Sequence, residues 1–142
     1  MAIAVNFDRP CKEPRPVKVR SYKVSNIHVY KGALLAVHRG TGYAVNAANA
    51  THNQVIGVAL AECDNSGGSV GDLSVQVGRG TYLFSKTSAA VTDVGCLATA
   101  VDNDTVDVGG SEVVNVGRVV GFLSTTHLWV DMNDDSINSH DA

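Results

Sequence analysis

Short apolar runs rich in β-branched residues, each ended by glycine, asparagine or aspartate, constrain the fold of this chain more than any other feature. The chain has 142 residues, and 23 of them are valine. β-Branched side chains suit pleated strands, and short strands separated by turn residues are typical of sandwiches and small barrels. No segment carries a sustained apolar pattern of helical period. The sequence therefore predicts an all-β protein with a single core.

One valine-rich segment occurs twice in the sequence. It is written "QVIGVALAE" at 54–62 and "GRVVGFLST" at 117–125, with Gly57 and Gly121 at matching positions. A glycine inside an apolar strand usually marks a bulge, a bend or the close approach of another backbone. We therefore expect each of these two strands to bend at its glycine.

The neighbouring segments match in the same order. Each half, 31–77 and 94–132, is predicted to run strand, loop, glycine-centred strand, strand, which indicates two similar β-meanders. A chance likeness between valine-rich strands is the alternative. All three prolines lie in residues 1–20, which we predict to be an extended arm because proline disfavours helices and central strands. We expect a single β-domain over 21–132 and a flexible acidic tail over 133–142.

Charge is divided unevenly along the chain. Residues 1–39 contain eight Lys and Arg and two acidic residues, a net charge of +6, whereas residues 40–142 contain three and twelve, a net charge of −9. The basic residues of the predicted arm are Arg9, Lys12, Arg15, Lys18 and Arg20. They are expected to dock onto an acidic protein surface, to contact phosphates or only to keep the arm solvated. Nucleic acid is the least favoured partner, because the acidic body would repel it.

Trp129 is the only tryptophan of the chain. In a strand it lies on the opposite face from Leu128 and Val130, so it points outward if those two residues face the core. A single large outward aromatic is often an anchor of an interface. The sequence thus predicts a contact of Trp129 with another subunit or a partner, with a second buried layer as the alternative.

Chemistry-bearing motifs are scarce. The histidines are far apart and match no metal-binding or catalytic spacing; they are His28, His38, His52, His127 and His140. The stretch "DNDTVD" at 102–107 lacks the glycine and glutamate of a helix-flanked calcium loop and favours a hairpin turn. We therefore predict no catalytic residue, no metal ligand, no cofactor and no enzymatic activity. No apolar run approaches the roughly 20 residues that span a bilayer, so no membrane partner is expected.

The segments "GALLAV", "VIGVALAE" and "GDLSVQVGRG", followed by "VGCLATAV", "RVVGFLS" and "LWVDM", resemble the phage capsid cement, or head decoration, proteins. The resemblance covers about residues 31–132. It implies a small β-barrel or β-tulip-like domain that forms a homotrimer and binds the major capsid protein. The expected location is the outer surface of the expanded head, reached after synthesis in the host cytoplasm, and the expected effect is stabilisation of the capsid. In such families the N-terminal arm pairs with capsid strands.

Two other classes of function remain open. A virion- or cell-surface β-barrel that binds or adheres to a partner would present aromatic residues in its loops, where only Tyr43 and Tyr82 lie near predicted turns. A small hydrolase would need a clustered acid, base or nucleophile, which the spacing of the sequence does not indicate.

Overall fold

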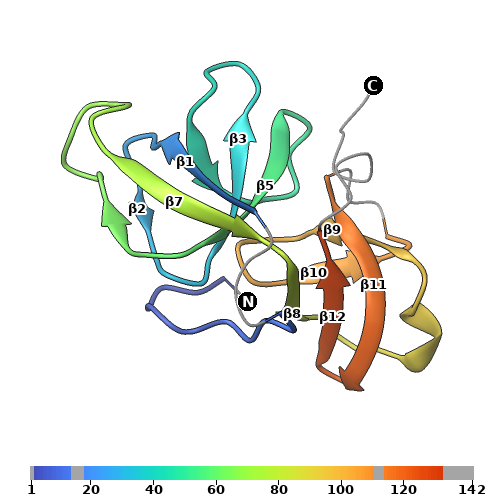
Figure 1. Ribbon diagram of the computed structural model, residues 1–142. Helices are drawn as coiled ribbons and strands as arrows, with labels where there is room; N and C mark the ends of the chain where they lie inside the picture. The colour runs from blue at the N-terminus through green and yellow to red at the C-terminus, as the bar shows by residue number, and fades with distance from the viewer. Residues whose placement is uncertain (1, 14–17, 111–113, 133–142) are drawn as a thin grey trace.

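The computed structural model describes residues 2–13, 18–110 and 114–132, and it is all-β, as predicted (Figure 1). The elements are β1 (Lys18–Lys23), β2 (His28–Val29), β3 (Leu34–His38), β4 (Ala44–Asn46), β5 (Asn53–Ala59), β6 (Cys63–Asp64), β7 (Ser74–Arg79), β8 (Thr81–Ser85), the 3-10 turn η1 (Val91–Asp93), β9 (Leu97–Ala100), β10 (Val106–Val108), β11 (Asn115–Ser124) and β12 (His127–Asp131). No helix in these ranges is long and apolar enough to cross a membrane.

The strands form two open five-stranded sheets. Sheet 1 has the order β1-β7-β5-β3-β4, sheet 2 has the order β8-β12-β11-β9-β10, and β2 pairs separately with β6. The predicted all-β class is confirmed, and the sheets do not form a closed barrel. A single residue, Gly80, joins β7 to β8. It is too short a connection for a hairpin, so β8 begins the second sheet instead of pairing with β7.

The two sheets have the same connectivity. Without the small β2–β6 pair, each sheet has five strands, and each reads first, fifth, fourth, second, third in chain order. The predicted meanders correspond to β3-β5-β7 and β9-β11-β12, which are antiparallel neighbours in both sheets. The repeat in the sequence is therefore a repeat of topology.

The main core lies between the sheets. Leu34 and Val55 of sheet 1 pack in one cluster with Phe84, Val119 and Val130 of sheet 2. All of these side chains are buried, and none is polar. The two halves therefore fold around one shared core, as expected for a single domain of this length.

A second core covers the outer face of sheet 1 only. Leu35, Ile56 and Val77 on that face pack with Val29 of β2 and Cys63 of β6. The β2–β6 pair is built from the two long connections of sheet 1, which run from β1 to β3 and from β5 to β7. In sheet 2, only Thr125 and Thr126 separate β11 from β12, so this connection has no room for a covering strand.

The first residues do not extend away from the body, as the predicted arm would. The Phe7 amide donates to the Lys31 carbonyl at 3.0 Å, and the Lys12 amide donates to the Thr81 carbonyl at 2.9 Å. Residues 2–13 therefore cross from sheet 1 to β8, along the lower side of the molecule in Figure 1. β1 starts at Lys18, so the sheet includes the last residues of the 1–20 segment.

Each glycine of the repeat lies at an irregularity in strand pairing. The register of β3 with β5 shifts beside Gly57, and the register of β11 with β12 shifts beside Gly121. Gly57 has a φ of +145°, and a Cβ there would lie 2.5 Å from the Gly78 carbonyl oxygen. At Gly121 the nearest atom would be Trp129 Cδ1, at 3.2 Å. A side chain at residue 57 is therefore disfavoured by the backbone of β7, whereas a side chain at residue 121 meets only the side chain of Trp129.

Candidate interaction surfaces

Arg9, expected to contact a partner, is buried inside the protein. Its side chain is 2% exposed. Nε donates to the Gly32 carbonyl, Nη1 to the Leu83 carbonyl and Nη2 to Asp104 Oδ1, each at 2.7 Å. These acceptors belong to both halves of the chain. Arg9 therefore links the two sheets, and its assignment to a docking surface is corrected.

The planar guanidinium of Arg9 is also enclosed by two aromatic rings. Its Cζ lies 4.7 Å from the centroid of Phe7 and 4.5 Å from that of Phe84. Burial lowers the pKa of Arg9, while the hydrogen bond and charge of Asp104 oppose that shift. A buried cation is tolerated when it is paired and hydrogen-bonded, as it is here.

The other basic residues of the predicted arm fall into separate places. Lys12 is exposed, and its Nζ lies 4.7 Å from the centroid of the Trp129 ring. Lys18 and Arg20 are part of β1. Arg15 lies outside the described residues, as does the tail 133–142.

Lys18 and Arg20 belong to a basic edge that sequence reasoning found only in part. With Arg79 of β7, they line a small hollow on the outer face of sheet 1. Lys18 lies opposite Arg79 in the antiparallel pair, and Arg79 Nε donates to the Ile56 carbonyl at 3.1 Å. We call Lys18, Arg20 and Arg79 the basic edge. Arg79 was missed because no local motif connects β7 with β1.

Trp129 has the orientation predicted for it. Leu128 and Val130 are fully buried in the main core, whereas Trp129 is only partly buried on the other face of β12. The Lys12 ammonium stands over its ring, an arrangement that attracts a cation to the π-face. The predicted contact of Trp129 with another subunit or a partner stays a prediction.

Sheet 2 carries a group of exposed apolar side chains on β11, on β9 and around η1. We call them the β11 cluster: Val91, Val94, Leu97, Val120 and Leu123. The stretch after η1 is bonded to β11, since the Gly95 amide donates to the Val119 carbonyl at 2.8 Å. In the repeat, Ile56 takes the place of Val120, and it is 8% exposed while Val120 is 47% exposed. The missing cover of sheet 2 accounts for this difference.

A polar network near Arg9 brings together serine, aspartate and histidine. Ser85 Oγ donates to Asp104 Oδ2 at 3.0 Å and lies 3.4 Å from His127 Nε2. His127 Nδ1 lies 2.9 Å from Thr126 Oγ1. In a hydrolytic triad the acid orients the histidine, but Asp104 binds Ser85 and Arg9 instead. No sequence signal joins these residues, because they lie 19 and 42 positions apart.

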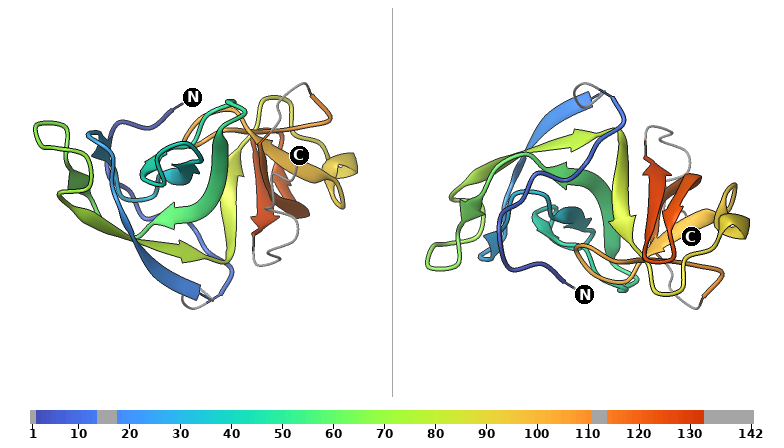
Figure 2. Two further views of the ribbon diagram at one scale, coloured as in Figure 1. Left: turned by 90° about the horizontal axis from the view of Figure 1, so that it is seen from above. Right: turned by 90° about the horizontal axis from the view of Figure 1, so that it is seen from below.

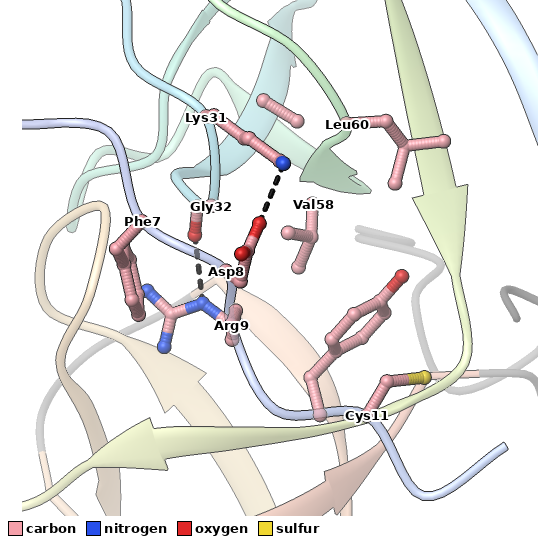
Figure 3. Close-up of a pocket in the computed structure, with 10 residues that line it drawn as sticks. Phe7, Asp8, Arg9, Cys11, Lys31, Gly32, Val58 and Leu60 are labelled. Carbon is pink, nitrogen blue, oxygen red and sulfur yellow. Dashed lines mark hydrogen bonds and ion pairs between the residues drawn. The ribbon is translucent and has the colours of Figure 1, made fainter. Parts of the chain in front are cut away.

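A cavity of about 170 Å³ lies where the N-terminal segment meets both sheets (Figure 3). The Asp8 carboxylate and the Lys31 ammonium point toward one another, 2.5 Å apart. Burial raises the pKa of the Cys11 thiol and that of the Tyr82 hydroxyl. Both groups are therefore held in their neutral forms, which are poor nucleophiles.

Metal ligands do not gather in the described part of the chain. No group of three or more His, Cys, Asp and Glu side chains there is placed to hold an ion. The nearest approach to one is His28, whose Nε2 lies 2.7 Å from Glu62 Oε2 and whose Nδ1 lies 3.8 Å from Asp64 Oδ2. The "DNDTVD" stretch forms a turn between β9 and β10, in which Asp102 Oδ1 accepts the amides of Asp104 and Thr105.

Comparison with models of protein families, with curated proteins and with solved structures returned no match for this chain.

Proposed function

We propose that this protein is a capsid decoration protein that binds the outer surface of a phage head as a homotrimer and stabilises it without enzymatic activity. The sequence resemblance over about residues 31–132 supports the proposal. The observation that carries it is the pair of separate contact surfaces, the basic edge on sheet 1 and the β11 cluster on sheet 2. A molecule that clamps neighbouring subunits needs two such surfaces, one for its own kind and one for the shell.

We assign the β11 cluster to contacts between copies of this chain. Its members are aliphatic, and Leu123 is 55% exposed. Apolar groups of this kind mark interaction sites, and interfaces between permanent subunits are more apolar than transient ones. Three copies joined in this way would present three basic edges. Linked weak contacts of that kind raise avidity by about 10²-fold or more.

A binding or adhesion module remains the alternative function. Such a module would rely on aromatic side chains exposed in loops. Tyr82, one of the two candidates from the sequence, is 3% exposed within β8. Tyr43 is partly buried, with its ring close to Gly71. Neither residue therefore favours the alternative over the proposed function.

The direct test is the content of purified phage particles from the source. Quantitative mass spectrometry would report copies of this chain per copy of the major shell protein, and external protease would report its accessibility. A ratio of about one with full accessibility is expected for a protein that covers the lattice. A ratio near zero would contradict the proposal.

The assignment of the β11 cluster has its own test. Leu123→Lys places a charge in the cluster, and we expect it to convert a trimer into monomers of 14.8 kDa by light scattering. Val70→Lys is the matched control, because Val70 is also exposed, at 46%, but lies in the connection between β6 and β7. Equal masses for both variants and the wild type would show that the cluster does not join copies of the chain.

A further inference from the structure

The outer side of β1 is an open sheet edge. β1 pairs with β7 in continuous register from Lys18 opposite Arg79 to Lys23 opposite Ser74. It is the end strand of sheet 1, and both views of Figure 2 show it at the rim of that sheet. Its free side is open from Lys18 to Tyr22 and meets another strand, β4, only at its far end, where Val24 bridges Ala44.

The register tells which backbone groups point to that side. The Val24 amide donates to the Leu73 carbonyl at 2.9 Å, which continues the ladder by one pair. Alternate residues of an antiparallel pair exchange hydrogen bonds. The even-numbered residues of β1 are therefore bonded to β7, and the amides and carbonyls of Val19, Ser21 and Lys23 point outward. At its end this side meets β4, where Val24 forms a parallel bridge with Ala44 and the Ser25 amide donates to the Ala44 carbonyl. Within the described ranges, Val19 and Ser21 receive no backbone hydrogen bond from that side.

The other sheet edges are covered or short. The N-terminal segment pairs with β8, where the Leu83 amide donates to the Pro10 carbonyl at 3.1 Å. The edge strand β4 receives a hydrogen bond of 3.0 Å from the Ser25 amide to the Ala44 carbonyl. The edge strand β10 has three residues, and its Val108 amide donates to Asp107 Oδ1 at 2.8 Å. With six residues, β1 is the longest edge left open in the described structure.

The charge of this edge selects its partner. The side chains of Lys18 and Arg20 share one face with Arg79, and the hollow between them is lined otherwise by Tyr22, Ile56 and Val77. Among the residues that the structure describes, none that lines this hollow is acidic. Like charges directly opposite one another are unfavourable across a strand pair, so two copies of β1 would repel. An incoming strand with acidic residues at alternate positions would face the basic side chains instead.

We propose that the open edge of β1 receives an extended strand of a partner protein that carries acidic residues at alternate positions. The main-chain bonds come from Val19 and Ser21, and the pairing of charges comes from the basic edge. The inference rests on the proposed function for the identity of the partner, which is then a shell subunit. The site itself is tested without phage particles.

The first experiment measures hydrogen exchange of the full chain by NMR with two synthetic peptides. One is a capped peptide of about eight residues in which aspartate and threonine alternate, and the other has lysine in place of aspartate. With a Kd of about 1 mM, the acidic peptide at about 5 mM slows exchange of the Val19 and Ser21 amides about sixfold. The basic peptide is expected to leave their exchange unchanged. No protection by the acidic peptide, or equal protection by both, would overturn the proposal.

Two variants separate the backbone from the charge. Ser21→Pro removes an amide that points outward and is not bonded to β7, so we expect an unchanged melting temperature and no protection by the peptide. Ser21→Thr is the matched control. It keeps the outward amide, so we expect the peptide to protect it as it protects the wild type. Arg20→Glu leaves the backbone intact and is expected to weaken binding of the acidic peptide at least about tenfold. Binding of the acidic peptide to Ser21→Pro with wild-type affinity would contradict strand addition.

Phage heads link the site to the proposed function. If wild-type protein sediments with purified heads and Ser21→Pro does not, the edge of β1 is the shell contact. If both sediment equally, the shell contact lies elsewhere and this inference fails while the proposed function stands. If neither sediments but the acidic peptide protects β1, the proposed function fails and the strand-binding edge stands.

Discussion

At the scale of single residues, Arg9 shows how one side chain changes role on folding. From the sequence it is one of five basic residues in a proline-rich segment. In the structure its three nitrogens reach Gly32, Leu83 and Asp104, which belong to different strands or turns. The positive charge of Arg9 is neutralised inside the protein by Asp104, so Arg9 does not contact a partner. Of the five basic residues, only the other four are candidates for such contacts.

We predict that Arg9→Met lowers the free energy of unfolding by about 2–4 kcal/mol, because it leaves the Asp104 carboxylate and two carbonyls without their donor. Urea denaturation measures the change. Arg20→Met is the control and should stay within about 0.5 kcal/mol of the wild type, since Arg20 is exposed. In Arg9→Met with Asp104→Asn the loss should be smaller than the sum of the two single losses. A fully additive double variant would contradict the pairing.

Tyr82 makes stability depend on alkaline pH. Burial raises the pKa of its hydroxyl above the ordinary value of 10.0, and the nearby Cys11 and Glu13 add to the shift. A group whose pKa is raised by folding contributes stability that is complete below its unfolded pKa and is lost as pH rises above it. We therefore predict that Tyr82→Phe loses less stability than the wild type when pH rises from about 9 to about 11.

Melting temperatures across that range measure the effect, with Tyr43→Phe as the control because Tyr43 lies outside both core clusters. The Cys63 thiol, whose pKa burial also raises, contributes equally to all three proteins. The Cys11 thiol interacts with the Tyr82 hydroxyl, so the difference between Tyr82→Phe and the wild type reports the phenol together with its coupling to Cys11. Parallel curves for these two proteins would contradict the prediction.

At the scale of elements, the two copies of the meander differ where their surroundings differ. β5 and β11 carry the same apolar pattern around Gly57 and Gly121, but β5 is covered on both faces and β11 on one. The glycines differ in the same way, because only Gly57 has a positive φ and a backbone oxygen in the place of a Cβ. Repetition of sequence therefore specifies connectivity, while neighbouring elements specify burial.

We predict that Gly57→Ala lowers the free energy of unfolding by about 2–4 kcal/mol, whereas Gly121→Ala costs about 1 kcal/mol or less. A methyl group at residue 57 meets fixed backbone, and one at residue 121 meets the side chain of Trp129, which can shift. Urea denaturation of both variants, compared with the wild type, checks the order. A larger loss of unfolding free energy for Gly121→Ala than for Gly57→Ala would contradict this order and would mean that residue 121 tolerates a side chain less well than residue 57.

At the scale of the whole molecule, the N-terminal segment holds the two sheets together. It binds Lys31, between β2 and β3, and then Leu83 and Thr81 of β8. Its Ile3 amide also donates to Asn103 Oδ1 at 2.8 Å, in the turn between β9 and β10. The segment is thus part of the fold and not an appendage that ends before the domain.

We predict that deletion of residues 1–13 lowers the melting temperature by about 10 °C or more, because it removes Arg9 and the edge cover of β8 together. Deletion of 133–142, which the sequence predicts to be a flexible tail, is the control and should leave the melting temperature unchanged. Scanning calorimetry of both proteins gives the comparison. A truncated protein as stable as the wild type would show that the sheets hold together without this segment.

The sequence by itself determined the all-β class, the duplication and the bends at Gly57 and Gly121. These features depend on the strand propensity of single residues and on the spacing of apolar residues, both of which can be read from short stretches of sequence. It also placed Leu128 and Val130 on the buried face of their strand, because alternation in a strand is a local rule.

Only the tertiary structure decided that the sheets stay open, that Arg9 is buried and that β1 presents a basic edge. Each of these depends on contacts between distant residues, such as Arg9 with Asp104 or Lys18 with Arg79. The prolines predict an extended segment, but they do not indicate where it lies, since an extended chain can either leave the body or pair with an edge of it. That choice depends on which edge is open and which acceptors are buried there, and no local pattern carries this information.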